Sequence, residues 1–311
     1  MSRLLFQISN LPLGYTIKLP LIGLAESYRN IAKRFKSNIP FNIKEGNGEI
    51  ICVTGGNKGI GKEVTKILVE HGYTVYILAR DEESSRKTME ECESLRGGCH
   101  YVHLDLADMG SINEVIQRFD GRKIRALINN AGILDNSNKM LVGQDLNFMV
   151  NYLGHYALTA GLIPQLKGGR IVCVTSCALF GINGFFPRKK GNFMKKYSES
   201  KLCNALHSLY LKSEIGIESV AVHPGTIRSG LFDDSWYGYF VKIISTIFPF
   251  ILDSTKEGAE AVVNACFTTD ISNDKNTIDL FISKERGIPP KYLNIKNARK
   301  LNDYSLKLIE K

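Results

Sequence analysis

Strands and helices alternate regularly from residue 49 onward, and this alternation restricts the chain to few folds. Helical patterns lie between the strands, at Gly61–Glu70, Glu82–Leu95, Ser111–Phe119 and around 145–165, 197–214 and 255–268. Runs rich in Val and Ile predict seven strands: Ile50–Thr54, Thr74–Ala79, His100–Asp105, Ala126–Asn129, Gly169–Thr175, Glu218–His223 and Thr277–Ile282. Crossovers of this length join parallel strands. We therefore predict an α/β fold: a single-domain, doubly wound, seven-stranded parallel sheet with helices on both faces.

The net charge of +9 is concentrated in two places. Residues 1–44 hold seven basic groups and one acid, and Arg188–Lys196 holds five basic groups and no acid. The remaining residues sum to −2, so the positive charge is local. This distribution favours a membrane surface or one anionic ligand as partner and argues against nucleic acid.

Residues 1–48 precede the alternating pattern, and their structure is not predicted by it. The uncharged stretch Leu4–Ile17 is 14 residues long and contains Pro12, which makes it too short to cross a bilayer. The longer uncharged stretch Leu146–Leu166 carries a polar stripe typical of an amphipathic helix: Asn147, Asn151, His155 and Thr159. We expect no membrane span, a basic and apolar extension at 1–48 that is a candidate surface anchor, and a catalytic domain at 49–311.

Seven cysteines without paired spacing argue against a disulfide framework and a structural zinc site. The sequence also lacks a cleavable-signal pattern. We therefore expect a cytosol-facing protein that is not secreted, with peripheral association with the endoplasmic reticulum or lipid droplets as the membrane alternative. Pairs such as His100 with His103, and Cys203 with His207, have no converging third ligand, so no metal site is predicted.

The first strand runs into Thr54–Gly61, which reads TGGNKGIG, and then into a helix. Glycines at such a turn let the backbone approach a pyrophosphate at the positive helix N-terminus. A plain turn is the alternative, but the position after the first strand of an α/β pattern favours phosphate binding. The residues expected to contact a dinucleotide here are Gly55, Asn57, Lys58, Gly59, Ile60 and Gly61.

The residue that follows the second strand indicates which dinucleotide binds. An acid there accepts from the ribose hydroxyl of NAD, whereas a base pairs with the extra phosphate of NADP. Arg80 stands at this position, Lys58 is placed to join it, and Asp81 is expected to point elsewhere. The prediction is NADP(H); the alternative is that Arg80 only begins a solvated helix.

More motifs follow in order: Asp105-Leu106, Asn130-Ala131-Gly132, Ser176, Tyr197-x-x-x-Lys201 and Pro224-Gly225-Thr226. With the glycine loop, they resemble the short-chain dehydrogenase/reductase family over roughly residues 49–282. VNYLGHY and SKLCNALH are similar to its retinol dehydrogenase branch, and the glycine loop with LARD resembles carbonyl reductases that use NADPH. The resemblance implies a Rossmann-type fold and further cofactor contacts from Asp105, Leu106, Asn130, Ala131, Gly132, Tyr197, Lys201, Pro224, Gly225, Thr226 and Ser229.

Within this resemblance, Asn151, Ser176, Tyr197 and Lys201 are the candidate catalytic residues. A free phenol, with a pKa of about 10, is a weak base near neutrality. The ammonium of Lys201, one helical turn after Tyr197, is expected to favour the phenolate. Ser176 would donate to the substrate oxygen. The resemblance implies that Asn151 holds a water that links Lys201 to a proton relay; an amide satisfied by its neighbours is the alternative.

The stretch Ser235–Leu252 has one charge, Lys242, and falls where the family builds its substrate lid, here expected around 230–254. An apolar lid favours a lipophilic alcohol, aldehyde or ketone of retinoid, steroid or isoprenoid type. A core or dimer-packing helix is the alternative reading of this stretch. The family resemblance also makes a homodimer a candidate assembly. The leading function is an NADP(H)-dependent oxidoreductase. The rival is a non-catalytic NADP(H)-binding regulatory or scaffold protein.

Overall fold

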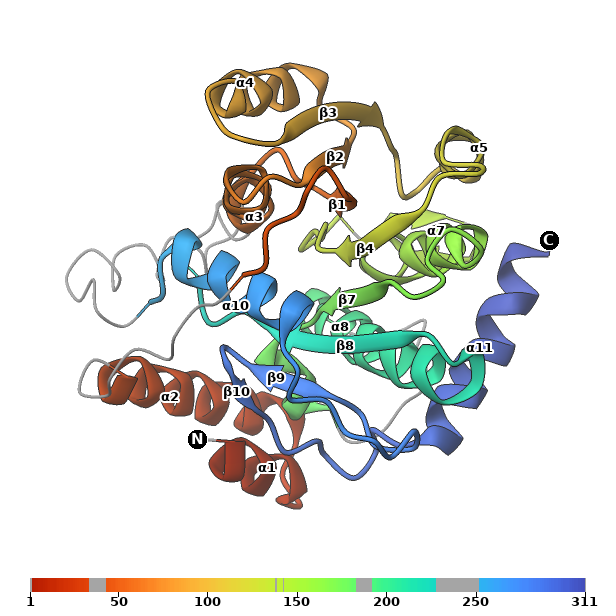
Figure 1. The fold of residues 1–311 in the computed structure, drawn as a ribbon. Helices are drawn as coiled ribbons and strands as arrows, with labels where there is room; N and C mark the ends of the chain where they lie inside the picture. Colours follow the sequence, from red (N-terminus) through yellow and green to blue (C-terminus); the bar gives the residue numbers. More distant parts are fainter. Residues whose placement is uncertain are drawn as a thin grey trace.

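The structure, a computed structural model, describes residues 2–33, 43–137, 139–141, 143–182, 192–227 and 252–310. Its centre is an eight-stranded sheet in the order β10-β9-β8-β7-β4-β1-β2-β3 (Figure 1). The strands are β1 (Ile50–Thr54), β2 (Thr74–Ala79), β3 (Gly98–His103), β4 (Ile124–Asn129), β7 (Arg170–Val174), β8 (Glu218–His223), β9 (Leu280–Ile282) and β10 (Glu285–Arg286). A separate hairpin pairs β5 (Met140–Leu141) with β6 (Gln144–Asp145).

The predicted α/β fold with seven parallel strands is confirmed, and β10 is an addition to it. Strands β1 to β4, β7, β8 and β9 pair in parallel, whereas β10 pairs antiparallel with β9. Strand β10 consists of Glu285 and Arg286 only, which is too short for a sequence pattern. It is identified as a strand by its hydrogen-bonded pairing with β9. The third strand begins and ends two residues before its predicted bounds, and β9 begins three residues later than predicted.

Helices cover both faces of the sheet. The helices that follow the strands are α3 (Gly59–Glu70), α4 (Glu82–Cys92), α5 (Met109–Arg118), α7 (Gly154–Leu162), α8 (Phe193–Tyr210), α10 (Thr255–Phe267) and α11 (Ile295–Ile309). Figure 1 shows α3, α4 and α10 on one side and α5, α7, α8 and α11 on the other. On the first side, Val64 and Leu68 of α3 and Val262 of α10 pack against the inner strands. The sequence pattern did not indicate α11.

The N-terminal residues form two helices, α1 (Ser2–Asn10) and α2 (Tyr15–Lys33), which lie beside the β9–β10 edge of the sheet (Figure 1). Leu5, Ile8 and Ile22 are buried in one hydrophobic cluster with residues of α8. Two charged side chains of α2, Glu26 and Arg29, are also buried. The inner side of the N-terminal helices is therefore packed against the rest of the chain.

Exposed apolar side chains gather on residues 2–33, above all on α2, whereas the exposed residues of α1 also include Arg3, Gln7 and Asn10. Among the described residues, five of the eight large hydrophobic side chains that are exposed belong to this segment: Leu4, Leu11, Ile17, Leu24 and Tyr28. Residues 17, 24 and 28 recur at seven and four positions, so they share one face of α2. No helix in the described part of the chain has the length and hydrophobicity needed to cross a membrane.

Candidate active site

The carboxyl ends of β1 and β4 are joined by hydrogen bonds at one edge of the sheet. The hydroxyl of Thr54 accepts from the backbone N–H groups of Asn130, at 2.9 Å, and Ala131, at 3.0 Å. The side-chain amide of Asn130 donates to the carbonyl of Thr54 at 2.9 Å. The glycine turn and the Asn130–Gly132 segment therefore form one rigid edge, where ligands bind in parallel sheets.

The glycine turn has the geometry of a phosphate cradle. Gly55 has a φ of +63°, and a Cβ at Gly61 would lie 2.1 Å from the carbonyl oxygen of Gly55, so only glycine fits there. Helix α3 begins directly after Lys58, whose side chain makes no capping hydrogen bond. The first N–H groups of α3 have no side-chain acceptor from that position, as an anion site requires. The residues present fit a nucleotide pyrophosphate.

Asp81 corrects one sequence expectation. It does not point away from the glycine turn, because its carboxylate pairs with the ammonium of Lys58 at 2.5 Å. It also caps α4 by accepting from the N–H of Ser84 at 3.0 Å. The Lys58 hydrogen bond and the Ser84 contacts lower the pKa of Asp81 to about 2. Arg80 beside it is exposed. To contact a nucleotide phosphate, Lys58 would therefore have to give up its ion pair with Asp81.

Asn57 supports the turn from inside. It is 8% exposed, and its amide donates to the hydroxyl of Ser84 at 2.6 Å. The hydroxyl of Thr88 in turn donates to the carbonyl of Asn57 at 3.2 Å. These contacts tie the glycine turn to α4, so the side chain of Asn57 serves to hold the turn in place.

Helix α8 places Tyr197 and Lys201 side by side in a buried position. The ammonium of Lys201 lies 5.8 Å from the centre of the Tyr197 ring, and it donates to the carbonyl of Val174 at 3.3 Å. Ser176, two residues after the end of β7, lies close enough to the phenol of Tyr197 to act on its pKa. Its hydroxyl also accepts from the N–H of Ala178 at 3.2 Å. The structure thus brings together three of the four candidate catalytic residues.

Burial dominates the ionisation of both groups. It raises the pKa of the Tyr197 phenol well above its ordinary value, although the neighbouring Ser176 side chain works in the opposite direction. The sequence predicted that Lys201 favours the phenolate; in the structure the ammonium faces the Tyr197 ring, and burial is the dominant effect on the pKa of the phenol. Burial also lowers the pKa of Lys201 to about 8.

Asn151 lies in a π-helical turn, Met149–Leu153, between α6 (Leu146–Phe148) and α7. Its amide oxygen accepts from the N–H of Ile133 at 2.7 Å, and its amide nitrogen donates to the Ile133 carbonyl and to Ser200, both at 3.0 Å. The Asn151 side chain is therefore hydrogen-bonded on both its oxygen and its nitrogen, and its role in a proton relay stays a prediction. Single π turns are frequent at functional sites.

The fourth candidate catalytic residue, Asn151, and Lys201 both lie close to Gly132. A Cβ built on Gly132 would lie 3.2 Å from the Lys201 ammonium and 3.4 Å from the Asn151 amide oxygen. Gly132 therefore leaves the space in which Asn151 and Lys201 approach each other.

His155 is a site residue that sequence reasoning did not single out, although it belongs to the polar stripe. One ring nitrogen lies 2.8 Å from the Thr54 hydroxyl and the other 3.0 Å from the Asn151 carbonyl. Burial lowers the pKa of His155 to about 4, so the ring is neutral near pH 7. It connects the glycine turn to the π turn, and its place in the stripe was the available signal.

The remaining predicted contacts lie at the same edge or outside the described residues. Asp105 and Leu106 follow β3, and the Asp105 carboxylate accepts from the N–H of Ala107 at 2.9 Å. Pro224, Gly225 and Thr226 follow β8. Residues 228–251 lie outside the described part of the chain, and so do Ser229 and most of the predicted lid.

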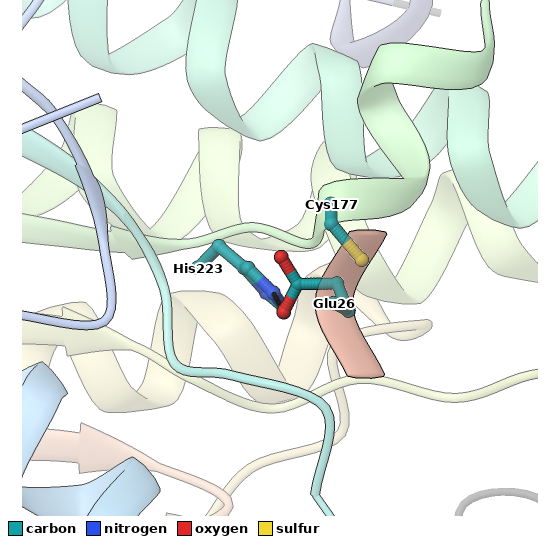
Figure 2. A group of neighbouring side chains, drawn as sticks. All are labelled: Glu26, Cys177 and His223. Atoms are coloured by element: carbon teal, nitrogen blue, oxygen red, sulfur yellow. Dashed lines mark hydrogen bonds and ion pairs between the residues drawn. The ribbon is translucent and has the colours of Figure 1, made fainter. Parts of the chain in front are cut away.

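One cluster near this edge offers three metal-ligating atom types. Within the described residues, the ligand atoms of Glu26, Cys177 and His223 all lie within 4.8 Å of one another (Figure 2). The Glu26 carboxylate already accepts from Arg29 at 3.1 Å and pairs with His223 at 3.2 Å. The positive charge that a metal would supply is therefore present in the side chains. All seven cysteines are free thiols.

Known sequences that are similar to this chain include dehydrogenases. Residues 49–237 match the family described as short chain dehydrogenase. Human retinol dehydrogenase 11 is 31% identical over 253 residues, which cover 76% of this chain and 79% of that protein. Zebrafish polyprenol dehydrogenase is 31% identical over 216 residues, which cover 62% of this chain and 66% of that protein.

Solved structures share the fold at lower identity. An uncharacterized protein from Mycobacterium paratuberculosis superposes with a TM-score of 0.65 at 21% identity, covering 88% of this chain and 98% of the other. A protein described as an NAD(P)-dependent gluconate 5-dehydrogenase from Beutenbergia cavernae, with bound NADP, gives 0.61 at 19% identity and covers 79% of this chain and 98% of its own.

The buried ammonium of Lys201 predicts a trade between stability and function. Folding a charged group whose pKa is lowered costs free energy below that pKa, so Lys201→Met should raise the free energy of unfolding at pH 7 by about 1–3 kcal/mol. The Val174 carbonyl keeps its second donor, the Asn204 amide at 3.0 Å. As the pH rises above about 8, wild type loses the lysine proton only when folded, and the difference should shrink.

Urea unfolding at several pH values measures this difference. Lys195→Met on the same helix, where the side chain is half-buried, is the matched control and should leave stability unchanged. A Lys201→Met protein less stable than wild type at pH 7 would show that the ammonium contributes to folding, contrary to this reading.

Proposed function

Because this chain belongs to the short-chain dehydrogenase family, we propose that it is an NADP(H)-dependent oxidoreductase acting on a lipophilic alcohol or carbonyl compound. The proposal assigns the general acid and base to Tyr197. The observation that carries it is the grouping of half-buried Ser176 with buried Tyr197 and Lys201 at the carboxyl edge of the sheet. Such an arrangement serves proton transfer, which nucleotide binding alone does not need.

In the proposed mechanism each residue has one task. Ser176 donates a hydrogen bond to the substrate oxygen and so stabilises negative charge that develops there. The Tyr197 phenol gives a proton to that oxygen in reduction and takes it in oxidation. Lys201 stabilises the resulting phenolate through its adjacent ammonium. The bound nicotinamide supplies or accepts the hydride.

The preference for NADP(H) rests on charge at the adenosine end. Arg80 is exposed directly after β2, where a cation can pair with a ribose phosphate. Lys58 is the second cation, although its present partner is Asp81. A distant structural neighbour is described with bound NADP, which is compatible with the same preference here.

The substrate class follows from the relatives and from sequence. Two relatives, retinol dehydrogenase 11 and polyprenol dehydrogenase, are named after lipophilic alcohols. The apolar stretch Ser235–Leu252, with a lid proposed at 230–254, provides a matching wall, although it lies largely outside the described residues. We propose a retinoid, steroid or isoprenoid alcohol, aldehyde or ketone.

A membrane surface is the proposed source of that substrate. In this proposal the exposed apolar face of α2, formed by Ile17, Leu24 and Tyr28, inserts among lipid headgroups. The exposed basic side chains of Arg3 and Lys44 would then meet anionic lipid. Residues 1–48 thus remain a proposed peripheral anchor on the cytosolic side of a membrane.

Replacement of the phenol tests the proposed chemistry. Tyr197→Phe should lower turnover of NADPH with retinoid, steroid or isoprenoid aldehydes by about 10²–10⁴-fold, because the proton donor is lost. Nucleotide affinity should stay within about twofold, since the ring remains. Tyr210→Phe, on the same helix, is the control. Turnover retained in Tyr197→Phe, or absent from wild type with the whole panel, would contradict the proposal.

Replacement of Arg80 tests the cofactor preference. Arg80→Gln should raise the KM for NADPH by about 10-fold or more and leave the KM for NADH unchanged, because one charge-assisted hydrogen bond to the extra phosphate is lost. Arg86→Gln, on the first turns of α4, is the exposed control. An equal change for both nucleotides would remove Arg80 from phosphate recognition.

Vesicle co-sedimentation tests membrane binding. Wild type should bind vesicles containing phosphatidylserine, less at high salt, and the double variant Ile17→Ser with Leu24→Ser should bind several-fold more weakly. Ile215→Ser with Leu306→Ser removes two exposed side chains elsewhere and should have no effect. The absence of salt-sensitive binding by wild type would end the membrane proposal.

A further inference from the structure

Helix α2 carries charged side chains into the interior at the end of β8. The carboxylate of Glu26 pairs with His223 Nε2 at 3.2 Å and with Arg29 Nε at 3.1 Å, and the hydroxyl of Thr226 lies 3.5 Å from it. Figure 2 shows Glu26 directed from α2 toward His223 of β8. The side chains of Glu26 and His223 are only 2% and 3% exposed. An N-terminal helix thus reaches the residues that lead into Pro224–Thr226.

Arg29 continues the same chain of contacts to the other side of that turn. Its guanidinium pairs with the carboxylate of Asp253 at 2.5 Å. The N–H of Asp253 donates to the carbonyl of Thr226 at 2.9 Å. A Cβ on Gly225 would lie 2.1 Å from the Asp253 carboxylate and 3.1 Å from the guanidinium. The turn is therefore held between α2 and residue 253, with no space to shift toward either.

The charges in this cluster balance one another. Burial disfavours the carboxylate of Glu26, but His223 and Arg29 outweigh burial and lower its pKa to about 2. Burial likewise disfavours an imidazolium at His223, yet the Cys177 thiol and Glu26 raise its pKa to about 10. Near pH 7 the carboxylates of Glu26 and Asp253 therefore face the cations of Arg29 and His223. Removal of one member leaves a buried charge without its partner.

The same helix also reaches the catalytic helix. Near the start of α2, the phenol of Tyr15 hydrogen-bonds to the hydroxyl of Ser198 at 2.8 Å, one residue after Tyr197. Tyr15 and Glu26 are eleven positions apart, which corresponds to about 16 Å along a helix. Helix α2 therefore connects the helix of the proposed acid to the turn proposed to face the nicotinamide.

We propose that Glu26 is a positioning residue: through His223 it fixes the Pro224–Thr226 turn in the conformation that receives the nicotinamide half of the cofactor. This inference rests on the proposed function only in assigning the nicotinamide to that turn. It makes the N-terminal helices part of the nucleotide site. It also distinguishes the two halves of the cofactor, because the glycine turn and Arg80 have no contact with α2 among the interactions described above.

Binding measured in two halves tests the proposal. Glu26→Gln keeps the size of the side chain but removes its charge, and we expect the Kd for NADP⁺ to rise about tenfold, as for the loss of one charge-assisted hydrogen bond. The Kd for adenosine 2′,5′-bisphosphate, which lacks the nicotinamide half, should change by less than about twofold. NAD⁺ and ADP provide the same comparison for the other cofactor. Glu83→Gln, exposed on α4, is the matched control.

A second variant establishes whether Glu26 acts through its partner. His223→Gln should give the same selective loss, and Glu26→Gln should add nothing further in that background. His223→Gln also provides the test if Glu26→Gln does not fold. These are binding measurements, so they remain informative even if no substrate is turned over and the proposed function fails.

Three results would overturn the inference. Equal weakening of NADP⁺ and adenosine 2′,5′-bisphosphate would assign Glu26 a general role in stability. Unchanged binding of both would separate the cluster from the cofactor. One zinc ion per purified wild-type chain, lost in Glu26→Gln, would assign Glu26, Cys177 and His223 to a metal.

Discussion

The ammonium of Lys201 is held in a position that excludes water, and the proposed chemistry depends on that constraint. Burial lowers its pKa to about 8, so near neutrality the charge is kept at a cost in stability. Its close neighbours are the Val174 carbonyl and the ring of Tyr197. A charge in such surroundings acts strongly on any group that approaches it, including a phenolate. The strand β7, the glycine at 132 and helix α8 together place it there.

The α/β core and helix α2 contribute different parts of the proposed site around Lys201. The α/β core supplies the glycine turn and Ser176 from residues that follow strands, as parallel sheets generally do, and Tyr197 and Lys201 from helix α8. Helix α2 comes from outside that core, yet its inner side carries Glu26 and Arg29 to the end of β8. Its outer side exposes Ile17 and Leu24. One helix thereby connects a proposed lipid-facing surface with the proposed nicotinamide wall.

The sequence predicted those strands and site residues that are marked by a short continuous motif. Strands β1, β2 and β8 have their predicted bounds, because buried parallel strands read as uninterrupted apolar runs between turn residues. Family motifs likewise placed Ser176, Tyr197 and Lys201 close together. Strand β10 and helix α11 were missed. The first is two residues long, and the second follows the last strand, where alternation provides no further expectation.

Contacts between distant residues could not be predicted in the same way. Glu26 and His223 are 197 positions apart, and neither lies in a pattern that points to the other. The pairing of Asp81 with Lys58 was missed because alternation along an extended strand stops where α4 begins, and the helix cap turns the carboxylate back. Burial dominates the pKa of Tyr197, and burial is a property of the folded chain that no local pattern displays.

Titration of the Tyr197 phenol, followed as the ultraviolet difference between wild type and Tyr197→Phe, tests the central claim most directly. Without nucleotide, the pKa should lie above that of an ordinary tyrosine, because burial dominates. With bound NADP⁺, whose ring adds positive charge beside Lys201, the same pKa should fall substantially. An identical titration with and without NADP⁺ would contradict the assignment of Tyr197 as the group that moves the proton.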